Sequence, residues 1–216
     1  LKDYQYDGLD TCAVDGMCAL NCPVDINTGD LVKRLRRENH SAFQNKLAKH
    51  VASNFGFYER LAKFSIRTGL FMNRIFGKNF MKRLTGGLKK IFPGMPAWSN
   101  QMLRPGRKIK SAELPSSTQQ VIYFTTCINR MMGGDTGQRF LSVCKKAGVN
   151  VIIPGHVEGA CCGQIFSSKG FTDAYRLMAN KTIEKLWQHS KEGTIPVVLD
   201  TTSCTQTFRS GISYLK

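Results

Sequence analysis

An alternation of short apolar runs with longer helical patterns constrains the fold of this chain more than any other feature. The β-branched and aromatic runs predict three strands, VIYFTT at 121–126, VNVIIPG at 149–155 and IPVVLDTT at 195–202. Helical patterns lie between them, at roughly 136–148 and 172–192. This order predicts right-handed crossovers and a parallel sheet. We therefore expect residues 119–216 to form a Rossmann-like, three-layer α/β half-domain with parallel strands.

Each predicted strand is followed by cysteine. These residues are Cys127, the adjacent pair Cys161 and Cys162, and Cys204. The carboxyl ends of parallel strands share one edge of the sheet, where folds of this class build their sites. Four thiolates from three separate loops are therefore expected to converge there.

Four convergent thiolates suit either zinc or an iron–sulfur cluster, because soft ligands select both. An adjacent pair such as Cys161 and Cys162 is awkward for a compact tetrahedral zinc site, which favours the cluster and leaves zinc as the alternative. Cys144 is different, since it lies within a predicted helix beside apolar residues. We expect it to be a buried, unliganded thiol.

A second group of cysteines lies near the N-terminus, in the run CAVDGMCALNCP. Bacterial ferredoxins bind a cluster through C-x₂-C-x₂-C-x₃-C-P. Cys12, Cys18 and Cys22 fall on three of those four positions, and Asp15 stands on the remaining one. Asp15 is either a direct ligand, which the spacing favours, or a loop residue beside a three-iron cluster.

Residues 41–118 form a basic connector between the two groups of cysteines. Apolar residues at helical spacing predict helices over 41–92, with breaks at Gly69, Gly77 and the pair 86–87, and the proline-rich stretch 93–118 is expected to be a linker. Residues 31–110 hold 19 of the 31 Lys and Arg residues, against two acids, Glu38 and Glu59. The net charge of +16 therefore belongs almost entirely to this part of the chain.

The basic helices could bind an anionic membrane surface or a partner protein, present a solvated face, or bind nucleic acid. Aromatic residues interleave with Lys and Arg, which favours attachment to a membrane surface. Nucleic-acid binding is not expected, because no known reading element is recognisable. The sequence shows neither a signal peptide nor an apolar run of the roughly 20 residues that a membrane-spanning helix needs.

Four segments together resemble the C-terminal iron–sulfur region of FAD-linked respiratory D-lactate dehydrogenases. They are TCAVDGMCALNCPVDINTG, TTCINRMMG, GACCGQIFSSKG and DTTSCTQT. More broadly, the pattern from Cys127 to Cys204 is similar to the cysteine-rich CCG domain of heterodisulfide reductase and of the C subunit of anaerobic glycerol-3-phosphate dehydrogenase. On this resemblance, residues 1–40 are a partial ferredoxin-like 4Fe-4S segment, and 119–216 are the first of two CCG repeats.

The resemblance implies an oxidoreductase with an upstream FAD domain that oxidises a D-2-hydroxy acid. Electrons would pass through 4Fe-4S clusters held by Cys12, Asp15, Cys18 and Cys22, and at the CCG site, to a quinone or cytochrome. A CCG-type electron-relay subunit and a zinc-stabilised interaction module are the alternatives. We expect a cytoplasmic protein, peripheral on the inner face of the membrane, of which this chain is an internal fragment.

The sequence departs from the family pattern at one further position. CCG domains end in C-x-x-C, but Thr207 stands three residues after Cys204. A cluster that needs five cysteines is therefore not expected, and four remain for an ordinary site.

Overall fold

The computed structural model describes residues 4–92, 94–109, 119–155 and 157–211. Its elements in chain order are the π-helix η1 Gln5–Asp10, α2 Met17–Leu20, α3 Thr28–Glu38, α4 Ala42–Ser53, α5 Phe55–Phe76, α6 Phe80–Ile91, β1 Gln120–Phe124, α7 Cys127–Met132, α8 Thr136–Lys146, β2 Asn150–Ile152, α9 Gln164–Ser167, α10 Thr172–His189, β3 Val197–Leu199 and α11 Thr202–Gly211. Part of the expected linker, residues 110–118, lies outside the described residues. None of the helices in the described ranges combines the length and apolar character needed to cross a membrane.

The described chain forms two compact units, and neither is continuous in sequence. The first unit comprises the described residues within 1–55, 161–185 and 202–216, and the second comprises those within 56–160 and 186–201. This division differs from the three consecutive segments expected from the sequence, which stay a prediction.

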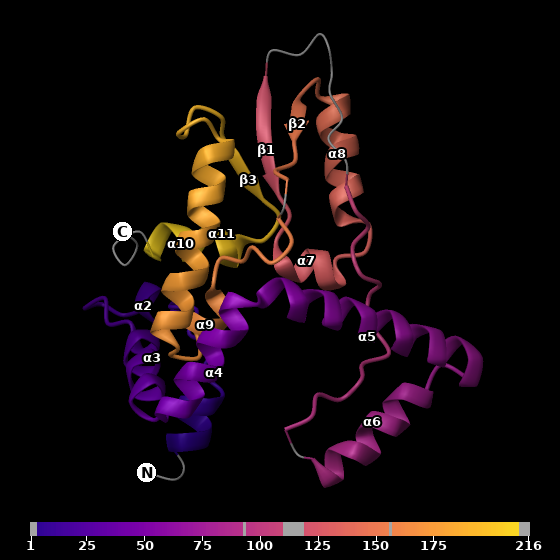
Figure 1. The fold of residues 1–216 in the computed structure, drawn as a ribbon. Coiled ribbons are helices and arrows are strands. Elements are labelled where there is room, and N and C mark those ends of the chain that lie inside the picture. The colour runs from indigo at the N-terminus through magenta and orange to yellow at the C-terminus, as the bar shows by residue number, and fades with distance from the viewer. Residues whose placement is uncertain (1–3, 93, 110–118, 156, 212–216) are drawn as a thin grey trace. The chain divides into compact units, whose positions relative to one another are not determined.

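The second unit contains a small parallel sheet in the order β2-β1-β3 (Figure 1). Val121 pairs with Val151, and Tyr123 pairs with Val198 on the other side. The central strand is the most deeply buried, because Ile122, Tyr123 and Phe124 are at most 1% exposed. The expected mixed α/β fold with parallel strands is therefore confirmed, although each strand is shorter than its apolar run.

Helix α8 covers the core beside β2, as Figure 1 shows. Tyr123, Cys144 and Val151 form one buried cluster, and the Tyr123 ring stacks on Phe140 with centroids 4.3 Å apart. Cys144 is therefore a core residue of the second unit, as expected.

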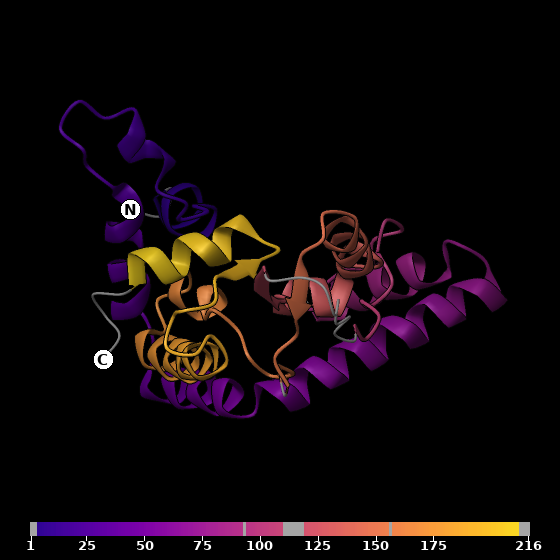
Figure 2. The same ribbon diagram turned by 90° about the horizontal axis from the view of Figure 1, so that it is seen from above.

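Helix α5 runs without interruption through Gly69 (Figures 1 and 2), and α6 contains Gly86 and Gly87. The breaks predicted at these glycines were wrong, whereas Gly77 does separate the two helices, with a φ of 94°. Gly69 is needed for packing, since a Cβ there would stand 2.4 Å from the Trp98 ring. Its small size admits Trp98 against α5.

The helix predicted over 172–192 is α10, and its apolar pattern predicts one buried face formed by Tyr175, Met178, Ile183, Leu186 and Trp187. Tyr175, Met178 and Leu186 are buried as predicted, whereas Trp187 is 55% exposed. Thr182, which is fully buried, occupies the side of the helix that Met178 and Leu186 share. A hydroxyl group thus lies where the pattern placed only apolar residues.

Candidate metal centre

Three of the four cysteines expected at the sheet edge come together in the first unit. Cys161 and Cys162 directly precede Gly163, the N-cap of α9, and Cys204 lies in the first turn of α11. All three are buried free thiols. The Cys162 Sγ donates to the Cys204 Sγ at 3.1 Å, well beyond the roughly 2.05 Å of a disulfide.

The environment of Cys162 favours a protonated thiol when no metal is bound. The contact with Cys161 lowers its pKa, but the contact with Cys204 and burial outweigh that effect and raise it to about 12. Metal ligation needs the thiolate, so binding a cation here would release a proton.

The cysteine pair is held by its backbone. The Thr182 hydroxyl accepts a hydrogen bond from the Cys161 N–H at 3.0 Å and donates one to the Cys161 carbonyl at 2.8 Å. Gly163 follows with a φ of 83°, and a Cβ on it would stand 2.7 Å from the Tyr175 ring. Both the backbone conformation and the close approach require glycine after the two cysteines.

Thr207 lies beside the same loop. It is buried, and its hydroxyl is 2.7 Å from both the Gln164 Oε1 and the Ser203 carbonyl. The hydroxyl therefore ties α11 to the first residue of α9, at the position where the family pattern has a cysteine.

Cys127 lies in the second unit, as the first residue of α7, and is half-buried. It follows β1 after Thr125 and Thr126, as the strand prediction implied. Its convergence with the other three cysteines stays a prediction.

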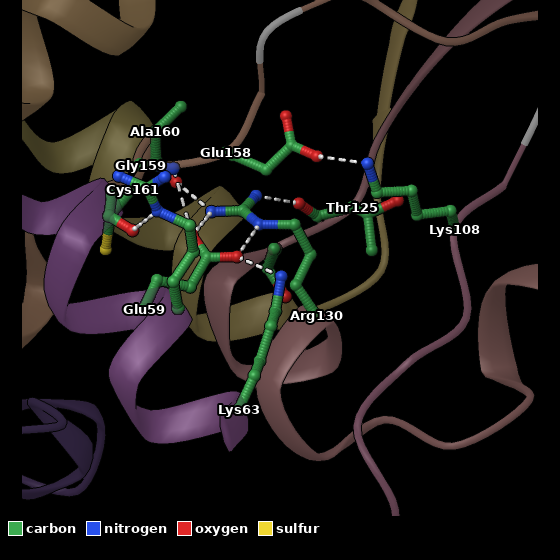
Figure 3. Close-up of polar contacts among 12 residues, drawn as sticks. Glu59, Lys63, Lys108, Thr125, Arg130, Glu158, Gly159, Ala160 and Cys161 are labelled. Carbon is green, nitrogen blue, oxygen red and sulfur yellow. Dashed lines mark hydrogen bonds and ion pairs between the residues drawn. The ribbon is translucent and has the colours of Figure 1, made fainter. Parts of the chain in front are cut away.

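A buried arginine holds the loops on which Cys127 and the cysteine pair are carried (Figure 3). The Arg130 guanidinium donates to the carbonyl of Thr125, two residues before Cys127. It also donates to the carbonyl of Ala160, the residue directly before Cys161. One side chain thus links two backbone segments that lie immediately upstream of predicted ligands.

Glu59 of α5 completes this arrangement (Figure 3). Its carboxylate accepts two hydrogen bonds from Arg130, each 2.8 Å long, one from Lys63 at 2.6 Å and one from the Gly159 N–H at 3.0 Å. Burial alone would raise the pKa of Glu59, but Arg130 and the other donors lower it to about 2. The carboxylate is therefore charged at neutral pH and binds the loop that leads into the cysteine pair.

The N-terminal run lies in the first unit. Cys12 and Cys22 are half-buried, whereas Cys18 is exposed in α2, with its sulfur 3.0 Å from the Thr28 hydroxyl. That hydrogen bond lowers the pKa of Cys18. The exposed Asp15 accepts a hydrogen bond at 3.1 Å from the N–H of Met17, the first residue of α2. Its predicted role as a ligand stays a prediction.

Arg36 of α3 joins this run to the segment that follows the cysteine pair. Its guanidinium donates to the carbonyls of Leu9 and Cys12, the latter at 2.9 Å, and to the carbonyl of Ser168. Gly170 lies so close to α3 that a Cβ there would stand 2.7 Å from the backbone nitrogen of Arg37. The run and the α9–α10 connection are therefore parts of one packed body.

Cys161, Cys162 and Cys204 fit a metal or an iron–sulfur cluster by their chemistry. Three buried sulfurs offer soft donors in a site that solvent does not reach. With the side chains as they stand, the described ranges contain no group of three or more His, Cys, Asp or Glu residues that could hold a metal ion.

Sequence reasoning missed the residues that support the cysteines, above all Glu59, Arg130 and Thr182. Two of them left a signal. Glu59 is one of only two acids in the strongly basic stretch 31–110, and a lone acid among many cations is a candidate for a buried ion pair. Thr182 lies four residues after Met178 and four before Leu186, on the apolar side of its helix.

Comparison with known families places these cysteines in a recognised domain. Residues 121–209 match the CCG family, described as a cysteine-rich domain. No curated protein and no solved structure matches the chain. The matched region contains five cysteines, namely the three buried thiols of the first unit, Cys127 and the core residue Cys144. The chain therefore carries a CCG cysteine-rich domain, which indicates an iron–sulfur or metal-binding electron-transfer module.

Proposed function

We propose that this chain is the iron–sulfur electron-transfer region of an FAD-linked D-2-hydroxyacid dehydrogenase, of the D-lactate dehydrogenase type. In this role it relays electrons from an upstream flavin domain to a respiratory acceptor, a quinone or a cytochrome. A bound 4Fe-4S cluster would supply the one-electron chemistry, and the residues of this chain would hold it and exclude water from it.

The observation that carries the proposal is the gathering of three buried thiols within the matched CCG domain. Cys161, Cys162 and Cys204 are each at most 6% exposed. A buried, sulfur-rich site protects a redox centre from solvent and influences its reduction potential. The cysteine run from Cys12 to Cys22 adds a second group of soft donors in the same unit.

The finer assignment to a D-2-hydroxyacid dehydrogenase is supported by the resemblance of the four cysteine-bearing segments alone. The alternative to this assignment is a CCG-type relay subunit, which receives electrons from a separate flavoprotein. Flavin bound to the same polypeptide, and reduced by D-lactate, would support the dehydrogenase.

The test is anaerobic purification of the full-length protein, followed by iron and acid-labile sulfide analysis and electron paramagnetic resonance. We expect iron and sulfide in equal amounts, and loss of one cluster signal in Cys162→Ala. Cys144→Ala is the matched control, because it removes a buried thiol of the same domain that lies in the core of the second unit. It should keep the full iron content.

Zinc without iron would overturn the redox proposal and favour a zinc-stabilised interaction module. The distance between two of the sulfurs supports the zinc alternative. Two thiolates bound to one tetrahedral zinc lie about 3.8 Å apart, from a Zn–S bond of about 2.3 Å. The sulfurs of Cys162 and Cys204 are 3.1 Å apart, so they need to move only slightly farther apart to reach that spacing.

A further inference from the structure

Helix α5 has two opposite faces, and only one of them packs within the second unit. Glu59 and Ile66 are buried, and Gly69 is covered by Trp98. The opposite face carries five large apolar side chains, each between 49% and 66% exposed: Phe57, Leu61, Phe64, Phe71 and Ile75. We call this set the phenylalanine stripe.

The stripe follows from a short repeat in the sequence. FYER, FSIR and FMNR begin at residues 57, 64 and 71, so that phenylalanine and arginine both recur every seven residues. At 3.6 residues per turn, a seven-residue spacing keeps each set on one side of the helix. Arg60, Arg67 and Arg74, all exposed, therefore form an arginine row along one flank of the stripe.

Helix α6 repeats this combination of exposed apolar and basic side chains. Leu84 and Ile91, again seven residues apart, are 45% and 69% exposed. Lys82, Arg83, Lys89 and Lys90 are exposed on the same helix. At the turn between the two helices, the rings of Phe76 and Phe80 contact each other with centroids 4.9 Å apart.

The charge of this hairpin points to the chemistry of its partner. Residues 55–92 contain nine Lys or Arg residues and a single acid, Glu59, which is buried and bound to Arg130. A basic helix with exposed Phe and Leu side chains, too polar to cross a bilayer, is typical of helices that lie in the plane of a membrane surface. Each exposed cation adds attraction to anionic lipids.

We propose that the α5–α6 hairpin binds an anionic membrane surface. The phenylalanine stripe enters the boundary between headgroups and acyl chains, and the arginine row contacts the lipid phosphates and carboxylates. This docking site goes beyond the electron-transfer function and does not depend on which cofactor the cysteines bind.

The test is flotation of the full-length protein with vesicles. One set is phosphatidylcholine alone, and in the other about one third of the lipid is phosphatidylserine. We expect binding to the anionic vesicles only, weakened when salt is raised from about 0.1 M to about 1 M. Arg60→Gln/Arg67→Gln/Arg74→Gln is expected to lower the partition coefficient about 100-fold.

A matched control removes three cations from elsewhere in the same unit. Arg139, Lys145 and Lys146 are exposed on α8, and their replacement by Gln changes the net charge by the same amount. This variant should bind within about threefold of the wild type, since distant charges are screened. An equal loss in both variants would overturn the proposal, because it would show that total charge alone matters.

Two further outcomes would also overturn it. One is the absence of binding to anionic vesicles. The other concerns the variant in which Phe57, Phe64 and Phe71 are replaced by Ser. If light scattering showed that this variant dissociates from an oligomer while its vesicle binding is unchanged, the stripe would be a contact between protein chains. The arginine variant should keep the iron content of the wild type. A loss of vesicle binding with unchanged iron content would therefore concern the docking site and not the electron-transfer function.

Discussion

At the residue scale, Thr182 satisfies two buried backbone groups of Cys161 with one hydroxyl. Replacement by Val keeps the volume but leaves the Cys161 N–H and carbonyl without this partner. A buried polar group that loses its hydrogen bond costs about 1–3 kcal/mol. We therefore expect Thr182→Val to lower the free energy of unfolding by about that amount, measured by urea denaturation.

Thr182→Ser is the control for this prediction. Serine keeps the hydroxyl and loses only a methyl group, so it should retain more of the stability than Val does. A Val variant as stable as Ser would contradict the role given to the hydroxyl.

At the scale of the elements, the Glu59–Arg130 pair connects α5 to α7 and to the loop before the cysteine pair. The pKa of Glu59 is about 2 when folded, against an ordinary value of 4.5. A carboxyl whose pKa is lowered by folding stabilises the protein above its unfolded pKa, and that stabilisation disappears as pH falls toward the folded pKa. We expect this group to account for about 3 kcal/mol of stability, lost between about pH 4.5 and pH 2.

Substitution of the two acids of the basic stretch tests this assignment. Glu59→Gln leaves the buried Arg130 charge uncompensated, and we expect it to cost about 3–5 kcal/mol at neutral pH and to remove this part of the acid dependence. Glu38→Gln removes a largely exposed ion pair with Arg34 and should cost less than about 1 kcal/mol. Equal effects of the two substitutions in urea denaturation would contradict the buried pair.

Two glycines of the basic helices should respond in opposite ways to alanine. Gly69→Ala places a Cβ 2.4 Å from Trp98, and we expect a loss of about 1–3 kcal/mol from overpacking. Gly87 lies within α6, and a Cβ on it would meet none of the described atoms within 4 Å. Gly87→Ala should therefore raise stability by about 0.5–1 kcal/mol through helix propensity, as thermal unfolding would measure.

At the scale of the whole molecule, the sequence predicted the strands and helices better than the polar residues that hold the cysteine loops. Alternating periodicities identified all three strands, because strand and helix patterns depend on local residues. Strand β1 ends before Thr125 and Thr126, whose backbone groups bond to Arg130 and Asp200 instead of a neighbouring strand. The rule for strand ends predicts convergence of Cys127, Cys161, Cys162 and Cys204 at one sheet edge, and that convergence stays a prediction.

The polar contacts around the cysteines could not be predicted in the same way. Glu59 and Arg130 are 71 residues apart, and no local pattern connects them. Which carbonyl Arg130 meets depends on the path of the loop at 159–160, which the chain adopts only when folded. Local pattern therefore predicts where the strands and the cysteines lie along the chain, while long-range packing decides which side chains hold the cysteine loops.

The contact between Arg36 and Ser168 has a consequence for biosynthesis. It joins positions 132 residues apart, and the first unit also draws on residues 202–211. During translation, the run from Cys12 to Cys22 leaves the ribosome long before the segments that pack beside it exist. The run therefore cannot complete its packing within the first unit until residues 202–211 have been synthesised.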